Sequence, residues 1–296
     1  MDIIHYNECP FCASSNIKKI FACKDFLVKG SFFDIYKCDN CGFRFTQDIP
    51  SLEKIGEYYK SEAYVSHSDS KKGILNKLYH IARNYMLGRK FSHIKSVTGK
   101  NSGKVLDIGA GTGYFVNYMK EKGFSPEGVE LDEDARKVAK NNFGIELKPI
   151  HNIYNLPEKE FDIITMWHVL EHIHDLDGYM KSINHTLKED GWFVCALPNF
   201  TSYDAAHYGK HWAAYDVPRH LWHFSPDFFM QFAAHYGFEV ITMRAMPLDA
   251  VYISLLSQKI EGKSIIAGFL KGGIFFLKSL FNTKRASSII YFLKKA

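Results

Sequence analysis

The most constraining feature of the sequence is a short apolar run that ends in three alternating glycines. Residues 105–113 are VLDIGAGTG, and a segment with helical spacing, YFVNYMKEKG, follows at once. A strand that turns directly into a helix needs residues without a Cβ, and the same absence lets a ligand touch the backbone. The order strand, glycine loop, helix therefore predicts a βα unit whose loop binds a ligand.

Beyond this loop, short apolar runs alternate with helical segments up to residue 198. This alternation is typical of parallel βαβ units with helices on both faces of a sheet. Two later runs, FEVITMR at 238–244 and SSIIYFL at 287–293, are expected to be further strands. The sequence thus predicts the α/β class, with a doubly wound, Rossmann-like, seven-stranded sheet.

The glycine spacing narrows the choice of ligand. The dinucleotide fingerprint G-x-G-x-x-G would need a glycine where Tyr114 stands, which argues against a nicotinamide or flavin coenzyme. The alternating glycines with Asp107 before them instead resemble motif I of the class I S-adenosylmethionine (SAM) methyltransferases. The resemblance covers roughly residues 100–198 and implies a SAM-dependent methyltransferase with SAM as cofactor.

Acids at the ends of the first two strands fit the polar groups of SAM. Asp107 is expected to pair with the ammonium group, directly or through water. Glu130 is expected to accept the ribose hydroxyls, with Leu131 against the adenine. The resemblance implies that the adenine edge lies near Asn152 and its face near Ile153. The predicted cofactor-binding residues are Asp107, Gly109, Ala110, Gly111, Gly113, Tyr114, Glu130, Leu131, Asn152, Ile153 and Trp167.

The fourth predicted strand leads into MWHVLEHIHD, residues 166–175, which holds candidates for chemistry on the methyl acceptor. If a helix begins at Trp167, then His168, Glu171 and His172 lie on one of its faces. Histidine titrates near neutral pH and can remove a proton from a hydroxyl. The candidate catalytic residues are His168, His172 and, further along the chain, His220.

A metal site is a second interpretation of this segment. It resembles the E-x-x-E-H arrangement with which ubiquinone-pathway O-methyltransferases and small-RNA 2′-O-methyltransferases bind a divalent ion, but His168 replaces the first carboxylate. Imidazole in that place favours a softer metal than magnesium, or removes the site. We favour the simpler hypothesis that Glu171 and His172 cap the helix and bond to the backbone.

Residues 203–226 are dense in histidine and aromatic side chains, and they follow the fifth predicted strand, where substrate-covering insertions enter this fold. We expect this stretch to surround the acceptor, with Arg219 clamping an anionic group and aromatic rings excluding water. The alternative is a packed aromatic loop whose histidines bond to the backbone. The predicted substrate residues are Trp212, Tyr215, Arg219 and His223, together with the catalytic candidate His220.

Four of the six cysteines form two C-x-x-C pairs separated by 25 residues. Two such knuckles on small hairpins are typical of a zinc ribbon, in which four thiolates leave no open position on the metal. We therefore predict a structural Zn²⁺ held by Cys9, Cys12, Cys38 and Cys41. A role in bracing or covering the catalytic domain is favoured for this module, and Cys23 and Cys195 are expected to be reduced thiols.

These features divide the chain into a zinc-ribbon module (1–49), a connector with leading helices (50–99) and a methyltransferase domain (100–296). A boundary is expected near Ser70, followed over 74–97 by a long helix or a broken pair of helices. Insertions are expected at 200–230 and 247–284. The second is apolar and basic, which permits peripheral contact with an anionic membrane through 250–285, although a helical pair covering the active site or joining two subunits is the favoured interpretation.

Lysine and arginine total 37 against 32 acids, too small an excess to indicate nucleic-acid binding. The first residues lack the order of a signal peptide, so a cytoplasmic location is expected. We expect methyl transfer to a small molecule: a sugar, an envelope precursor or a quinone-like hydroxyl. The alternatives are an RNA or protein methyltransferase that uses the zinc ribbon for recognition, and a non-catalytic SAM-binding scaffold. The oligomeric state is open.

Overall fold

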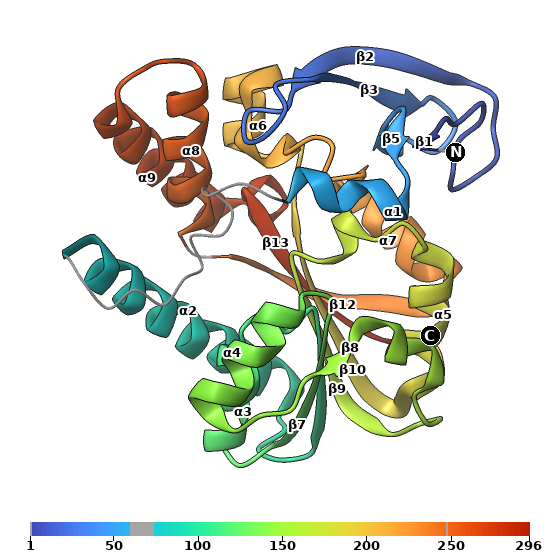
Figure 1. Ribbon diagram of the computed structural model, residues 1–296, viewed down its shortest axis with the longest axis vertical. Helices are drawn as coiled ribbons and strands as arrows, with labels where there is room; N and C mark the ends of the chain where they lie inside the picture. Colours follow the sequence, from blue (N-terminus) through green and yellow to red (C-terminus); the bar gives the residue numbers. More distant parts are fainter. Residues whose placement is uncertain (1, 60–73, 247) are drawn as a thin grey trace.

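A mixed seven-stranded sheet forms the centre of the computed structural model, which describes residues 2–59, 74–246 and 248–296 (Figure 1). The strand order is β12-β13-β10-β9-β6-β7-β8, and β13 runs antiparallel to both of its neighbours. The predicted fold class and the two late strands are confirmed. The strands are β6 (Lys104–Ile108), β7 (Ser125–Glu130), β8 (Lys148–Pro149), β9 (Phe161–Trp167), β10 (Leu187–Pro198), β12 (Phe238–Ala245) and β13 (Ser288–Lys295).

Both faces of the sheet are covered because successive buried residues of each strand point to opposite sides. Val105 and Ile163 pack on the side of α2 (Ile74–Thr98) and α3 (Tyr114–Glu121). Leu106 and Ile164 pack on the other side, with α5 (Leu176–Thr186) and α7 (Pro226–His235), while α4 (Glu133–Phe143) lies beside β7. The predicted long helix is thus present as α2, whereas the boundary expected near Ser70 lies outside the described residues.

The cysteine-bearing module is a small antiparallel sheet that reaches into the catalytic domain. Its order is β11-β4-β3-β2, so the strand β11 (Trp222–His223), from the far end of the chain, pairs with β4. The module's own strands in this sheet are β2 (Ile17–Lys24), β3 (Phe32–Cys38) and β4 (Arg44–Thr46). The strands β1 (Ile3–Ile4) and β5 (Ile49–Pro50) pair with each other in a separate two-stranded sheet, and the short helix α1 (Leu52–Ile55) follows. The sequence did not indicate this shared sheet.

Two helical insertions flank the carboxyl ends of the parallel strands. The first contains α6 (Tyr203–Tyr208), and the second forms the helical pair α8 (Asp249–Ile260) and α9 (Ile265–Phe281) between β12 and β13. Figure 1 shows this pair at the edge of the molecule, beside α6. None of the helices in the described ranges has the length and hydropathy needed to cross a bilayer.

Candidate active site

The glycine loop after β6 has the backbone that the sequence predicts. Gly109, Gly111 and Gly113 have φ of +72°, +53° and +79°, a region in which a side chain is strained. A Cβ on Gly109 would lie 2.5 Å from a methyl of Val169, and one on Gly113 would lie 2.8 Å from Ala139 Cβ. A Cβ on Gly111 would meet nothing within 4 Å. Gly109 and Gly113 therefore allow close packing, whereas Gly111 leaves backbone open beside the strand ends.

The two predicted acids flank this loop. Asp107 is almost fully buried and accepts a 2.6 Å hydrogen bond from the Thr165 hydroxyl, and burial raises its pKa to about 7. Glu130 accepts hydrogen bonds of 2.7 Å from the Gly111 amide and 2.9 Å from the Asp132 amide. The carboxylates thus lie on both sides of the glycine loop, one buried and one partly exposed.

The residues predicted to contact the adenine differ in how exposed they are. Leu131, beside Glu130, is 70% exposed and Asn152 is partly exposed in the 3-10 segment Ile150–Asn155. Ile153 is only 1% exposed and packs in the main core. The prediction that the Ile153 side chain offers a face to adenine therefore does not fit its position, because the core already covers it.

Helix α2 places two cations over the loop region, which the sequence analysis missed. The Arg83 guanidinium lies 3.4 Å from the ring centre of Tyr114, and Lys90 Nζ lies 4.3 Å from that of Trp167. Burial lowers the pKa of Lys90 to about 8, against the opposing effect of Asp107. The Trp167 indole nitrogen is buried and has no hydrogen-bond partner among the described residues. The only sequence signal for these cations was the helical spacing of the segment before the glycine loop.

The segment after β9 is not the expected helix. His168 has φ of +58°, and only a 3-10 turn, Leu170–His172, follows before α5. As a result, the side chains of His168 and His172 diverge instead of sharing a helix face. His168 contacts Asp249 at the start of α8, whereas His172 packs edge-to-face on His220 with ring centres 4.6 Å apart.

His168 is held as a cation. Its Nε2 lies 3.1 Å from Asp249 Oδ2 and its Nδ1 lies 3.4 Å from Glu171 Oε1. Burial alone would lower its pKa, but interaction with the two nearby carboxylates raises it to about 10. A histidine that keeps its proton at neutral pH does not accept one from an acceptor, so the predicted general-base role does not fit His168.

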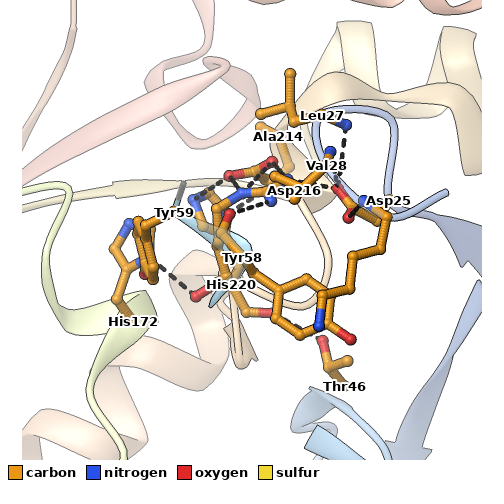
Figure 2. A network of polar contacts seen from close by, with 12 residues as sticks. Asp25, Leu27, Val28, Thr46, Tyr58, Tyr59, His172, Ala214, Asp216 and His220 are labelled. Carbon is orange, nitrogen blue, oxygen red and sulfur yellow. Dashed lines mark hydrogen bonds and ion pairs between the residues drawn. The ribbon is translucent and has the colours of Figure 1, made fainter. Parts of the chain in front are cut away.

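Glu171, His172 and His220 form a compact group, with one ligand atom of each within 4.8 Å of the others. His172 Nδ1 donates to the Arg219 carbonyl at 2.9 Å, and His220 Nδ1 donates to the Ala214 carbonyl at 2.9 Å (Figure 2). A carbonyl only accepts, so Nδ1 of each ring carries a proton, and in a neutral His172 ring Nε2 keeps its lone pair. Burial, with the neighbouring His220, lowers the pKa of His172 to about 4, which keeps that ring neutral.

The Glu171 carboxylate in this group is 1% exposed; its Oε1 forms the ion pair with His168 at 3.4 Å, but neither oxygen has a partner with hydrogen-bond geometry among the described residues. The hypothesis that Glu171 caps a helix is therefore wrong, although His172 does bond to the backbone as expected. A buried carboxylate beside two imidazole rings, each fixed by a carbonyl on its Nδ1, is a donor set of the kind that binds divalent metals. The group therefore fits either a proton acceptor or a divalent ion.

Arg219 does not face an acceptor. Its side chain is 1% exposed and bonds to both oxygens of Asp216, to Asp25 at 3.1 Å and to the Tyr58 carbonyl at 2.9 Å (Figure 2). Asp25 also accepts from backbone amides of the loop after β2. The prediction that Arg219 binds an anionic group of the acceptor is therefore wrong. Its hydrogen bonds instead connect the cysteine module to the insertion at 200–230.

The other predicted substrate residues are also buried between these two parts. Trp212 donates its indole N–H to Asp204 at 2.7 Å, and Tyr215 packs edge-to-face on Phe21 of β2. His223 lies in β11 with Nε2 3.0 Å from Thr46 Oγ1, and burial lowers its pKa well below the usual value. The alternative of a packed aromatic loop describes these three residues, and His220 alone of the group lies beside His172.

The four predicted zinc ligands come together, with one ligand atom of each within 4.8 Å of the others. Cys9 Sγ lies 3.7 Å from Cys41 Sγ, and Cys12 Sγ lies 3.6 Å from Cys38 Sγ. Four thiolates around a tetrahedral Zn²⁺ lie about 3.8 Å apart, because each Zn–S bond is about 2.3 Å. All six cysteines are unbridged, so the residues fit a structural zinc ion.

The sheet order, the glycine loop and the flanking strand-end acids define a class I SAM-dependent methyltransferase fold. A family model described as "Methyltransferase domain" matches residues 81–243, more than half of the chain, so the chain belongs to this family.

Among curated proteins, the chain is 31% identical over 103 residues to the ubiquinone biosynthesis O-methyltransferase of Pelagibacter ubique, covering 33% of this chain and 43% of that protein. It is 30% identical over 125 residues to the enzyme of the same name from Thiobacillus denitrificans, covering 39% and 54%. The chain thus spans about half the length of the curated relatives it matches.

Solved structures share the fold. A SAM-dependent methyltransferase from Archaeoglobus fulgidus matches with a TM-score of 0.50 and 22% identity, over 72% of this chain and 94% of that one. Geranyl diphosphate C-methyltransferase from Streptomyces coelicolor A3(2) matches with a TM-score of 0.51 and 12% identity, over 78% and 88%. At these identities the likeness establishes the fold alone.

Proposed function

We propose that this chain transfers the methyl group of SAM to a hydroxyl of a small-molecule acceptor. The observation that carries the proposal is the group Glu171, His172 and His220, which begins two residues after Val169, the residue packed on Gly109 of the glycine loop. A sulfonium is already activated, so the protein mainly needs to align the acceptor and remove its proton.

On the cofactor side, charges are arranged to match the amino-acid part of SAM. Asp107 supplies an anion for the ammonium group. Lys90, which interacts electrostatically with Asp107, supplies a cation for the carboxylate. Glu130 accepts the ribose hydroxyls, and Leu131 and Asn152 lie next to the adenine. This assignment gives each strand-end residue one partner on the ligand.

On the acceptor side, His172 is the candidate base. Its ring is neutral, Nδ1 is tied to the Arg219 carbonyl, and Nε2 is left to take a proton. His220 supplies a second fixed ring at van der Waals contact, and the His168 cation holds Glu171 from the other side. His168 and Arg219 are positioning residues in this scheme, since carboxylates of the folded chain hold both side chains.

The small-molecule class is supported by the relatives, which are named for an O-methylation step in ubiquinone biosynthesis. A quinone-like hydroxyl is therefore the first acceptor to test, before sugars and envelope precursors. Two other functions stay open to the same assays: methylation of RNA or protein through the cysteine module, and SAM binding without turnover.

The test is calorimetry with S-adenosylhomocysteine (SAH), followed by a labelled-methyl screen of phenolic, sugar and RNA acceptors. Asp107→Asn and Glu130→Ala are expected to weaken SAH binding at least about tenfold, as expected for the loss of a charged hydrogen bond. Glu133→Ala, which removes an exposed acid from α4, is the matched control and keeps wild-type affinity. Unchanged affinity in both site variants contradicts the cofactor assignment, and labelling of RNA alone contradicts the acceptor class.

A divalent ion held by Glu171, His172 and His220 is a second candidate, favoured by the unsatisfied carboxylate. When bound, such an ion would act as a Lewis acid on an acceptor hydroxyl. Mn²⁺ prefers oxygen and nitrogen ligands over thiolates, so loss of the aqueous Mn²⁺ signal in electron paramagnetic resonance reports this site and not the cysteines. Saturable binding that disappears in Glu171→Gln supports the ion, and absence of binding leaves His172 as a base without metal.

The four-cysteine cluster is proposed to hold Zn²⁺ in a structural role. The support is the Sγ spacing, which matches a tetrahedral thiolate site, and the absence of any open ligand position for chemistry. Metal analysis of the purified chain is expected to give about one zinc per chain, and none in Cys38→Ser.

A further inference from the structure

Helix α9 exposes its apolar side instead of burying it. Gly268, Gly272 and Ser279 share one side of the helix and are buried, and a Cβ on Gly272 would lie 2.5 Å from the Val251 Cα of α8. The opposite side carries large apolar side chains that are each more than half exposed: Ile265, Ile266, Phe269, Leu270, Ile274, Leu277, Leu280 and Phe281. Single exposed apolar residues are ordinary, but a contiguous face of this size marks an interaction surface.

The charges around this apolar face have one sign. Residues 250–285 hold six basic side chains and a single acid, Glu261, which Lys263 neutralises at 2.9 Å. The basic residues are Lys259, Lys263, Lys271, Lys278, Lys284 and Arg285. Lys271 and Lys278 lie on one flank of the apolar side, next to α6, where they contact His207 and Tyr203. A partner that covers the apolar side therefore meets a positive border.

The positive charge around the apolar side distinguishes two possible partners, a second copy of this chain and a lipid surface. A second copy of this chain, docked face to face through α9, would place lysines of one copy near lysines of the other, with only Glu261 to offset them. A surface of anionic phospholipid offers both an apolar interior for the exposed side chains and negative headgroups for the lysine border. An anionic lipid surface thus complements both the apolar side chains and the basic side chains around them, whereas a symmetric dimer would complement only the apolar side chains.

We infer that α9 is an interfacial helix that docks the protein on an anionic phospholipid bilayer. The glycines Gly268 and Gly272 on the packed side let α9 lie close against α8, which leaves the large apolar side chains of α9 facing outward. Helix α8 begins at Asp249, which contacts His168 at 3.1 Å, so the docking surface is built on the same helical pair that borders the active site. An acceptor dissolved in the bilayer would reach the site from this side.

The test is binding of the full chain to vesicles. Wild-type protein is expected to co-sediment with phosphatidylcholine vesicles that contain phosphatidylglycerol, and much less with phosphatidylcholine alone. Phe269→Ser with Leu277→Ser is expected to weaken binding by about tenfold or more, because two large apolar groups no longer enter the bilayer. Phe32→Ser with Leu52→Ser removes two equally exposed apolar residues elsewhere and is the matched control.

Raising the salt concentration is expected to release the wild-type protein, since exposed charges are screened. Thermal unfolding and SAH binding of both double variants are measured alongside and are expected to match the wild type, because all four positions are exposed. The inference is overturned if wild-type protein ignores anionic vesicles, or if the α9 variant binds as well as the control. It is also overturned if wild-type protein is a dimer that the α9 substitutions convert to a monomer without vesicle binding.

Discussion

Among single residues, the buried charged side chains of the described ranges fall into two groups: those with an oppositely charged partner in an ion pair and those without one. Arg219 has carboxylate partners in the folded chain, and His168 has two. Among the described residues, Asp107 has one hydrogen-bond partner, the neutral Thr165 hydroxyl, and burial raises its pKa to about 7. Fully partnered groups hold the fold, whereas an under-partnered group costs stability and is suited to bind a ligand of opposite charge.

The first prediction concerns Asp107→Asn. The folded-state pKa of about 7 lies above the unfolded value of 3.8, so the native state holds the proton more tightly and this group's contribution to stability falls as pH rises from 4 to 7. Asparagine does not titrate, so the stability of the variant does not contain this pH-dependent contribution. Its free energy of unfolding relative to wild type is expected to rise across this range, by up to about 4 kcal/mol, in chemical denaturation without cofactor. SAH affinity falls at the same time.

A pH-independent difference between the two proteins would contradict the raised pKa of Asp107. In the wild type, SAH affinity is expected to increase from pH 6 to pH 8 as the carboxylate ionises, and this increase should be missing in Asp107→Asn. The combination of a more stable apo protein with weaker ligand binding separates a binding residue from a structural one.

The second prediction concerns Arg219→Met. Loss of this guanidinium leaves Asp25 and Asp216 without their buried partner, which is expected to cost about 3–5 kcal/mol of unfolding free energy. Arg244→Met, at an exposed arginine of β12, is the control and should change stability little. If Arg219→Met were as stable as the control and raised only the KM for the acceptor, Arg219 would be a substrate residue after all.

Among the secondary-structure elements, the turns that follow strands β6 and β9 position the residues of the candidate site. Gly109 lets the loop approach Val169, and Val169 stands at the start of the turn that carries Glu171 and His172. The positive φ of His168 turns the chain out of β9 and sends this side chain to α8. The cofactor loop and the acceptor group are therefore coupled through one backbone contact.

The third prediction tests that contact with Gly109→Ala. Gly144 has a similar φ of +65° but open space around it, so Gly144→Ala reports strain alone and is expected to cost about 1–2 kcal/mol. Gly109→Ala adds a clash at 2.5 Å and is expected to cost more and to weaken SAH binding. Combining it with Val169→Ala should recover part of both losses. Equal costs in the two glycine variants would show that the contact is unimportant.

At the scale of the whole molecule, the cysteine module and the catalytic domain share structure. Strand β11 of the insertion completes the module's sheet, Phe43 stacks on Phe228 of α7, and Arg219 reaches Asp25. The module therefore rests on the same insertion that carries His220 toward His172. Disorder in the module is expected to reach the acceptor side of the site.

The fourth prediction is that metal loss destabilises the whole chain. Cys38→Ser is expected to abolish zinc binding and to lower the thermal midpoint of the catalytic domain, because the module supplies one wall of a common core. Cys23→Ser, at a buried cysteine outside the cluster, should keep about one zinc per chain and lose less stability. Two separate unfolding transitions in calorimetry, with the catalytic one unchanged in Cys38→Ser, would contradict the shared core.

The sequence was sufficient where a local rule acts on neighbours in the chain. Alternating apolar runs fixed the strands, glycine spacing fixed the loop backbone, and the C-x-x-C pairs indicated four thiols that do meet. Site prediction failed at Arg219, Trp212, Tyr215 and His223, because a dense run of polar aromatics looks the same whether it surrounds a ligand or another part of the chain.

The α/β sheet, the glycine loop with its two acids and the four-cysteine cluster follow from local sequence patterns, since backbone conformation and ligand spacing are set within a few residues. Four other features depend on long-range packing: His220 joins Glu171 and His172, His168 lies between two carboxylates, Lys90 lies over Trp167, and α9 turns its apolar side outward. The physical reason is that charge state and exposure depend on which distant segments pack together, and no local pattern records that packing.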